Sequence, residues 1–369
     1  MPSQPRFSPA DLRLPLVQAP MAGGASTPAL AAAAARAGAL GFLAGGYLTP
    51  EVLARQIAET RGLAGPAGSR AFGVNLFIPQ PVAEPDLLAA YRQELEAREA
   101  SRHGVTLPDP DLTDTDHFAE KIELLVADPV AVVSFTFGLP DADTLARLKD
   151  QGSYTIGTVT SAAEALAALA AGVDALCVQG PEAGGHRGVF DPVAAPSKAP
   201  LEELFAEVRA AVAESGEGTG GGEGGSAGPG DGGAGTPLIA AGGLATARDV
   251  ARLRSAGAAL TQHGTAFLRA DEAGTPAMHR DALIDPAYAE TVLSRAFSGR
   301  WVRTLRNGFT DRHPEAPAAY PAINQLTRPL RAAALQRGDA QGMGLYAGVN
   351  HAAAQAAPAA DILAALAGE

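Results

Sequence analysis

Residues 238–265 read LIAAGGLATARDVARLRSAGAALTQHGT, and this stretch decides the fold. Two short apolar runs, 238–241 and 260–263, each end beside glycine and flank a helical pattern. Thr246 offers a hydroxyl that can cap the first backbone N–H groups of this helix. Gly257 follows the helix at the position where a left-handed residue is favoured. The stretch therefore predicts a strand, a helix and a second, parallel strand.

The same alternation of apolar runs and Ala/Leu-rich helical patterns extends through the chain, with hydroxyl caps at Thr27, Thr49 and Ser161. Eight such strand and helix units favour closure into an α/β barrel, the (β/α)8 or TIM barrel. A length of 369 residues suits one barrel of about 250 residues with additions. The predicted strands are Leu14–Ala19, Leu40–Ala44, Phe72–Leu76, Val130–Phe135, Tyr154–Val159, Ala175–Gln179, Leu238–Ala241 and Leu260–His263.

Three segments do not fit this repeat. Residues 79–117 are rich in proline and acidic residues, so we predict an insertion after the third strand, a surface excursion with a helix over residues 87–100. Residues 215–235 are dominated by glycine, which predicts a flexible loop. We expect the barrel to occupy residues 1–270 and residues 271–369 to form a mostly helical cap over its active-site end.

The composition narrows the possible classes of function. A hydrophobic fraction of 47% and a charged fraction of 18% predict a folded core. A net charge of -12 disfavours binding to nucleic acid or to a membrane surface, although a local basic pocket can still bind a small anion. The single cysteine, Cys177, lies in an apolar run and is expected to be buried. The first residues show no secretory signal, so we expect a cytoplasmic protein.

Glycines and amides follow several predicted strands, at the end of the barrel where such folds place their sites. Gly242, Gly243 and Gly264 come after the seventh and eighth strands, where backbone N–H groups can reach phosphate oxygens if no Cβ intervenes. Ordinary turn glycines are the alternative explanation. Asn75 and Gln179 end two other strands, and their amides can pair with the edge of a flavin or a purine, or simply satisfy a turn.

His186 lies in the glycine-rich loop that follows the sixth strand. Histidine changes charge near neutral pH, which suits a general base or a switchable hydrogen-bond donor. The alternative is an exposed loop histidine without a role. Among the other six histidines, His263 is the best candidate because it ends the eighth strand. The scatter of the rest, and the absence of HExxH or CxxC spacing, lead us to expect no metal site.

Eight motifs, most of them at strand ends, have counterparts in one known family. They are Gln18–Gly24 with Ser26–Pro28, Gly41–Tyr47, Asn75–Phe77, Gln179–Gly188, Ala240–Gly243, Gln262–Leu268, Ser298–Arg300 and Leu305–Asn307. On these motifs the chain resembles the nitronate monooxygenases, formerly called 2-nitropropane dioxygenases, and is similar to their bacterial class I branch. The resemblance covers nearly the full length of the chain.

The resemblance implies a barrel that binds FMN. Met21 and Ala22 would line one side of the isoalloxazine ring, and Asn75 and Gln179 would contact it. His263 stands where the family has an apolar residue, so its effect on the phosphate end is open. The residues implied at that end are Gly184, Gly242, Gly243, Gly264 and Thr265, with Gln262 and His263 beside them.

The resemblance also implies a reaction. His186 matches the family histidine near the reactive face of the flavin, where it takes the α-proton of a nitroalkane or hydrogen-bonds a nitronate. The family converts a nitronate and O2 to a carbonyl compound and nitrite without nicotinamide, with propionate 3-nitronate as the usual substrate. An anionic substrate implies a locally positive pocket, for which the candidates are His186, Arg187, Arg306 and Arg328, with Tyr320 as a hydroxyl donor.

Two other functions remain open at this point. An NAD(P)H-dependent FMN reductase, like quinone or enoyl-ACP reductases, would share the same glycines. The loop 182–188 with His186, together with the class I-like start at Gln18–Pro28, favours the monooxygenase. A non-catalytic binder of flavin or of a phosphate ligand is the other. The Ala-rich helices would pack on the barrel or form the contact of a homodimer.

Overall fold

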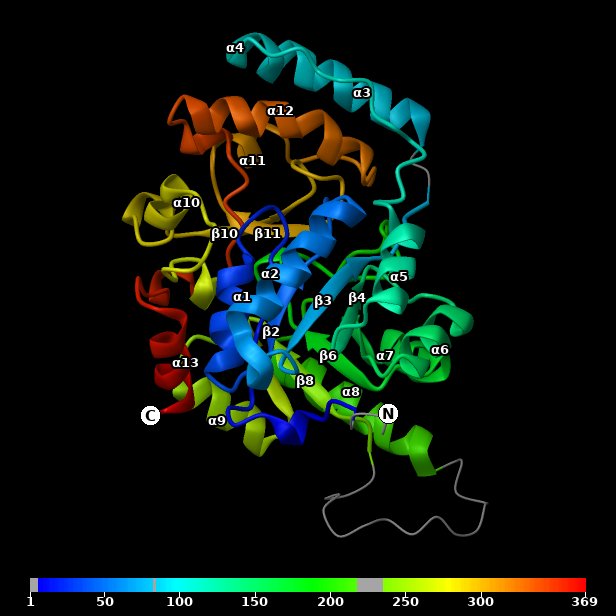
Figure 1. The fold of residues 1–369 in the computed structure, drawn as a ribbon. Helices are drawn as coiled ribbons and strands as arrows, with labels where there is room; N and C mark the ends of the chain where they lie inside the picture. Colours follow the sequence, from blue (N-terminus) through cyan, green and yellow to red (C-terminus); the bar gives the residue numbers. More distant parts are fainter. Residues whose placement is uncertain (1–5, 82–83, 218–234) are drawn as a thin grey trace, which may run out of the picture.

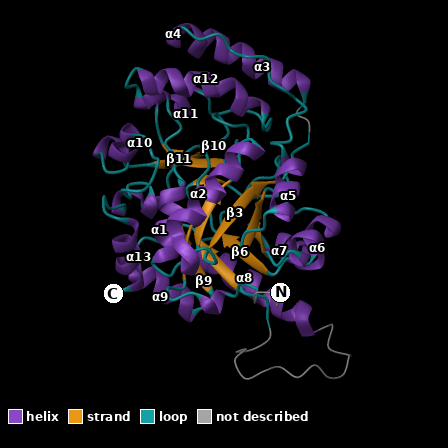
Figure 2. Ribbon diagram, viewed as in Figure 1, coloured by secondary structure: helices purple, strands orange, loops and turns teal. Residues whose placement is uncertain are grey.

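The computed structural model describes residues 6–81, 84–217 and 235–369, and its centre is a barrel of eight parallel strands (Figures 1 and 2). The strand order is β1-β9-β8-β6-β5-β4-β3-β2, and a parallel bridge between Val17 and Leu40 brings β1 back to β2. The predicted (β/α)8 barrel is therefore confirmed. Its strands are β1 (Leu16–Gln18), β2 (Gly41–Ala44), β3 (Phe72–Phe77), β4 (Val132–Thr136), β5 (Tyr154–Val159), β6 (Ala175–Gln179), β8 (Leu238–Ala241) and β9 (Leu260–His263).

Helices surround this barrel, and their starts follow the caps expected from the sequence. The side chains of Thr27, Thr49, Ser161 and Thr246 each accept a hydrogen bond from a backbone N–H in the first turn of a helix. The helices around the barrel are α1 (Pro28–Arg36), α2 (Pro50–Gly68), α5 (Phe118–Ala127), α6 (Ala142–Asp150), α7 (Ala162–Ala171), α8 (Leu201–Glu217), α9 (Ala247–Ser255) and α13 (Ala359–Ala367).

The C-terminal segment has two different locations. Its last helix, α13, packs Ile362 and Leu363 against Leu30 of α1 and Val250 of α9, so it completes the helical layer of the barrel instead of covering the site. The rest lies at the carboxyl end of the strands (Figure 1). That part contains α10 (Ala277–Ala282), β10 (Thr291–Ser294), β11 (Val302–Leu305), α11 (Gly308–Arg312) and α12 (Ala322–Gln336). Strand β11 pairs with β7 (Gly185–His186) and β10 in a small antiparallel sheet.

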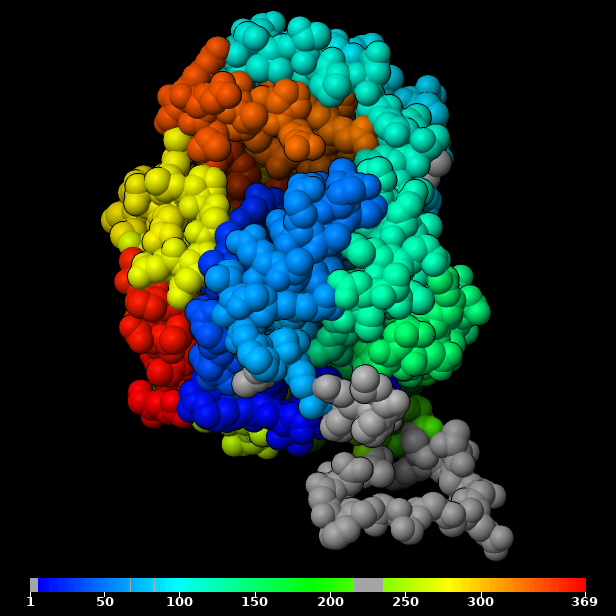
Figure 3. Space-filling model, viewed as in Figure 1, coloured from blue at the N-terminus to red at the C-terminus, as the bar shows by residue number. Residues whose placement is uncertain are grey.

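The insertion after β3 packs on this C-terminal part. It forms α3 (Pro85–Leu95), a π-helix over Glu96–Ala100 and α4 (Ser101–His103), which run along α12 at the outer end of the molecule (Figures 1 and 3). The expected helix over residues 87–100 is present. The segment is more than a surface excursion, because Tyr91 and Leu95 are buried in one hydrophobic cluster with residues of the C-terminal part.

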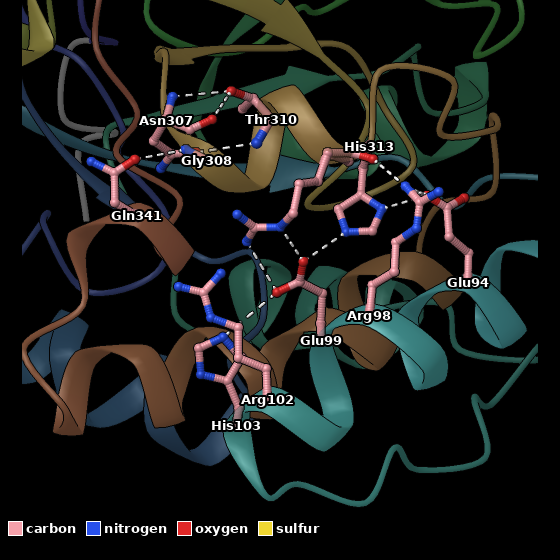
Figure 4. A network of polar contacts seen from close by, with 12 residues as sticks. Glu94, Arg98, Glu99, Arg102, His103, Asn307, Gly308, Thr310, His313 and Gln341 are labelled. Atoms are coloured by element: carbon pink, nitrogen blue, oxygen red, sulfur yellow. Dashed lines mark hydrogen bonds and ion pairs between the residues drawn. The ribbon is translucent and has the colours of Figure 1, made fainter.

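A buried carboxylate joins the insertion to α11 (Figure 4). Glu99 is fully buried and bonds Arg312 Nε at 2.5 Å and His313 Nε2 at 3.2 Å, while His103 Nε2 lies 3.6 Å from its other oxygen. Burial opposes ionisation of Glu99, but His313 and Arg312 lower its pKa to about 2. The insertion is thus held by a charged network as well as by apolar packing.

Apolar side chains fill the barrel toward its amino end. Phe42, Ile156 and Cys177 are buried there, and the ring of Phe7 packs against Tyr154 at a centroid distance of 5.5 Å. Cys177 is buried as predicted, and burial raises the pKa of its thiol to about 12. Because this end is closed, the open volume of the barrel lies at the carboxyl end of the strands.

Short 3-10 turns complete the described fold, at Pro9–Asp11, Thr265–Phe267, Pro286–Tyr288, Ala340–Gly342 and His351–Ala353. Most of the predicted flexible loop 215–235 lies outside the described residues, and only 215–217, at the end of α8, and 235 are described. Over the described ranges, no helix has both the length and the apolar character needed to cross a membrane.

Candidate active site

A cavity of about 660 Å³ opens at the carboxyl ends of the strands. This volume lies within the range of about 300–1,000 Å³ that is usual for small-molecule and cofactor sites. Loops after β1, β2, β6, β8 and β9 line it, together with residues of β3, β4 and β5, helix α12 and the segment 343–354. The lining residues expected from the sequence are Met21, Ala22, Asn75, Gln179, Gly184, His186, Gly242, Gly243, Gln262, His263, Gly264, Thr265 and Arg328.

One end of the cavity is formed by glycine-rich backbone. Gly242 and Gly243 have φ values of 124° and 66°, which side-chain-bearing residues rarely adopt. Thr265 Oγ1 accepts a hydrogen bond from the N–H of Gly348 at 2.9 Å, so the C-terminal segment reaches this end. A Cβ on Gly184 would stand 2.4 Å from the same nitrogen. Backbone can approach a ligand closely here because side chains are missing.

The two amides at strand ends are engaged within the protein. Asn75 Nδ2 donates to the hydroxyls of Ser134 at 2.9 Å and Thr136 at 3.0 Å. Gln179 Nε2 donates to the carbonyl of His186 at 2.9 Å, and its Oε1 accepts from the N–H of Gly188 at 2.8 Å. Gln179 therefore holds the histidine loop in place, a role that the sequence did not predict. Both side chains still line the cavity.

His186 projects into the cavity from β7. Its Nε2 lies 2.9 Å from Ser298 Oγ, and the rings of Phe137 and Tyr346 lie 5.4 and 6.0 Å away between centroids. Burial, followed by the charges of Arg300 and Arg331, lowers the pKa of His186 to about 3. The imidazole is therefore neutral at physiological pH and can accept a proton or a hydrogen bond.

His263 lines the cavity with an almost fully buried ring. Its Nε2 lies 2.9 Å from Thr261 Oγ1 and its Nδ1 3.2 Å from the carbonyl of Leu244. Burial lowers its pKa to about 4, so the ring is neutral. Both nitrogens have partners within the protein, and the ring connects β9 to the loop that carries Gly242 and Gly243. This explains how a polar residue is accommodated where an apolar one was expected.

The predicted cations have three different positions. Arg306 does not line the cavity, contrary to the prediction. Its side chain is exposed and pairs with Asp311 at 2.9 Å and Glu290 at 3.2 Å. Arg187 does not line the cavity either, contrary to the prediction. It is fully buried and donates to the carbonyls of Gly180 and Gln179, so it supports the loop that carries His186. Arg328 lines the cavity and is exposed at its mouth.

Tyr320 lies close to the cavity without lining its main volume. Its ring centroid is 6.1 Å from that of His186, and with Tyr47 it borders a small adjoining cavity of about 20 Å³. Tyr47 and Phe137 have left-handed φ values of 68° and 79°. Strained backbone of this kind clusters at functional sites, where the surrounding structure holds it. The N–H of Tyr47 donates to Asp116 Oδ1 at 2.8 Å, which supports this conformation.

Sequence reasoning missed two residues at the site, one that contacts His186 and one that lines the cavity. Ser298 contacts His186 from 112 positions away in the chain, a distance that no local pattern reveals. Arg331 lines the cavity three residues after Arg328, and this spacing on a helix puts both on one face. Two arginines three residues apart in a helical pattern are the sequence signal from which Arg331 could have been predicted. Among the described residues, no group of three or more His, Cys, Asp or Glu side chains could hold a metal ion.

The fold and the cavity define an α/β-barrel enzyme that acts on a small molecule at the carboxyl end of its strands. The family model described as nitronate monooxygenase matches residues 10–369. The nitronate monooxygenase of Paraburkholderia phytofirmans is 37% identical over 363 residues, covering 95% of this chain and 91% of that protein. The probable nitronate monooxygenase of Bacillus subtilis is 32% identical and covers 91% of this chain and 90% of its own length.

A solved structure agrees with these relatives. The nitroalkane oxidase of Streptomyces ansochromogenes is 44% identical, with a TM-score of 0.86 over 98% of this chain and 96% of that chain. The chain belongs to the nitronate monooxygenase family, and it is an oxidoreductase.

Proposed function

We propose that the protein is an FMN-dependent nitronate monooxygenase that converts an alkyl nitronate and O2 to a carbonyl compound and nitrite. The observation that carries this proposal is the position of His186, oriented by Ser298 inside a cavity whose other end is lined by glycine backbone. Membership of the family supports it. O2 as co-substrate, a homodimer and a cytoplasmic location stay predictions.

The residues present fit FMN. The glycine-lined end, with Gly242, Gly243, Gly264 and Thr265, would hold the phosphate, and Met21 and Ala22 would border the ring. The fit rests on the missing side chains: a Cβ at Gly242 would lie 3.1 Å from the backbone nitrogen of Ala183 and would crowd the loop that faces the ligand. Bound FMN would supply the one-electron redox chemistry, so the chain itself needs no metal or reactive thiol.

His186 would act on the substrate. Because the ring is neutral, it can hydrogen-bond a nitronate that has already lost its α-proton. It can also take that proton from a neutral nitroalkane, but a pKa of about 3 makes it a weak base, so this is the slower route. Two residues limit the movement of His186. Gln179 bonds its backbone carbonyl, and Ser298 contacts its Nε2 atom. Phe137 and Tyr346 shield the ring from water.

The substrate we propose is an anionic nitronate such as propionate 3-nitronate. A protein of net charge -12 needs local positive charge to receive an anion. Arg328 provides it at the mouth of the cavity, where an exposed guanidinium can attract a second anionic group on the substrate.

Gly242→Ala should weaken FMN binding about tenfold. The added methyl group strains or displaces the backbone at the phosphate end, and a loss of about 1.4 kcal/mol in binding free energy corresponds to a factor of ten. The measurement is the ratio of flavin to protein after dialysis, with the dissociation constant from fluorescence titration. Gly152→Ala is the matched control, since Gly152 also has a positive φ (88°) but lies beside β5 at the other end of the barrel, with open space around its Cβ position. Equal loss of flavin in both variants would argue against a phosphate site at Gly242.

The proposed function is tested by anaerobic visible spectra of the purified protein, recorded before and after adding a nitronate and, separately, NADPH. We expect a flavin spectrum that changes with the nitronate and not with NADPH. Reduction by NADPH alone would favour the reductase, and a protein that retains no flavin even when reconstituted with FMN would overturn the assignment.

A further inference from the structure

Helix α12 places a second arginine in the cavity, deeper than Arg328. Arg331 lines the cavity, and its charge acts on two rings there. After burial and Arg300, it helps to lower the pKa of His186, and it opposes the burial that raises the pKa of Tyr346. Arg328 is exposed at the mouth of the cavity, whereas Arg331 is half-buried. The two guanidinium groups therefore occupy different depths, one near the reacting group and one near solvent.

Arg331 is held in place without a neutralising partner. Its Nη2 donates to Asn324 Oδ1 at 2.7 Å and to the Asn324 carbonyl at 3.1 Å. Its Nε is buried with no hydrogen-bond partner, and over the described residues no carboxylate pairs with the guanidinium. A buried guanidinium is normally paired with a carboxylate or bound to an anionic ligand. Arg331 is half-buried, with a buried Nε, and its guanidinium is oriented at the cavity by a neutral amide.

The neighbouring titratable groups support the same conclusion. His186 is neutral, and burial raises the pKa of both Tyr346 and Tyr47, so these phenols are neutral too. Asp116 is directed to the backbone of Tyr47 and to Lys121, 2.9 Å away. Arg300 also acts on His186, but it is buried behind the cavity. Its guanidinium lies over the Phe137 ring at 4.0 Å and donates to Gln80 and to the carbonyl of Val189. Among the described residues that line the cavity, Arg331 is thus the positive charge that acts on His186.

We propose that Arg331 binds the anionic nitro group of the substrate and makes the enzyme prefer the nitronate to the neutral nitroalkane. This inference rests on the proposed function and adds the residue that determines its specificity. The nitronate carries its negative charge on the nitro oxygens, which a guanidinium can hold by charge-assisted hydrogen bonds. A neutral nitroalkane gains much less from the same contact.

Arg331→Gln tests the proposal, with ethyl nitronate and neutral nitroethane as the two substrates. We expect KM for ethyl nitronate to rise about 10- to 100-fold, as for the loss of a charged hydrogen bond to a bound anion, and KM for nitroethane, which binds as a neutral molecule, to change less than about threefold. Arg337→Gln is the matched control, because Arg337 ends the same helix outside the cavity and donates to the carbonyl of Arg102. An equal rise in KM for both substrates, or no rise, would overturn the proposal.

Two further measurements keep the test decisive. Nitrate, a planar oxyanion, should bind the FMN-loaded wild-type protein in isothermal titration calorimetry and bind Arg331→Gln about tenfold more weakly. If wild type turns over neither substrate, the proposed function fails, whereas the nitrate result still decides for or against an anion site at Arg331. If Arg331→Gln does not fold, Asn324→Ala removes the side-chain oxygen that orients Nη2; an unchanged preference for nitronate in that variant would refute the proposal.

Discussion

His186→Ala should lower kcat/KM for neutral nitroethane by about 100-fold or more, the usual contribution of a positioned general base. Preformed ethyl nitronate has already lost the α-proton, so its kcat/KM should fall much less. The structure supports this expectation because the ring lies in the cavity with Nε2 held by Ser298. Steady-state kinetics with both substrates at the same pH measure the difference.

The nitronate is the internal control for that variant, together with its flavin content. A pKa of about 3 also means that His186 stays in its neutral form from pH 5 to 9, so the nitroethane profile of wild type should show no acidic limb from this group above about pH 5. Equal losses for nitroethane and ethyl nitronate at full flavin content would show that His186 is not the base.

Acid should destabilise the protein well before its carboxylates titrate. Burial lowers the pKa values of His186, His263 and His279 to about 3, 4 and 4, against an ordinary value near 6.5. Between pH 6.5 and 4 the unfolded chain binds protons that these folded rings refuse, so the free energy of unfolding falls as the pH falls through that window. At pH 5 each ring lowers the free energy of unfolding by about 1–2 kcal/mol relative to pH 7, or by roughly 3–6 kcal/mol for the three together.

Urea denaturation of the FMN-loaded protein at pH 7 and pH 5 measures this loss. His279→Gln provides the comparison, because His279 Nε2 contacts only the carbonyl of Tyr346, at 3.1 Å, and a glutamine amide can donate in its place. That variant should lose about 1–2 kcal/mol less between the two pH values than wild type. A free energy of unfolding that is unchanged from pH 7 to pH 5 would mean that these rings are protonated in the folded state.

Local signals account for how much of the fold could be predicted. All eight strands lie within a few residues of their predicted positions, because apolar runs of strand length bounded by glycine are short-range features. Thr27, Thr49, Ser161 and Thr246 cap helices as expected, since an N-cap bond spans only three residues. The insertion was located correctly, but its burial against α12 required partners more than 190 residues away.

The residues of the candidate site also fall into those that local signals predict and those that depend on distant segments. Residues at strand ends, such as Gly242 and His186, could be placed because a parallel barrel brings the ends of all its strands together. Arg306 was misplaced because nothing local distinguishes an arginine facing solvent from one facing a cavity. Arg331 and Ser298 were missed because their roles depend on how the C-terminal segment folds over the barrel.

The sequence by itself determined the barrel, the order of its units and the end that carries the site, since periodicity and capping act over a few residues. Only the tertiary structure decided which groups meet there. It turned the Gln179 amide toward the His186 loop, placed Ser298 on the His186 ring and left Arg331 without a carboxylate. The reason is physical: hydrogen bonds and charges between distant segments depend on packing that no local pattern encodes.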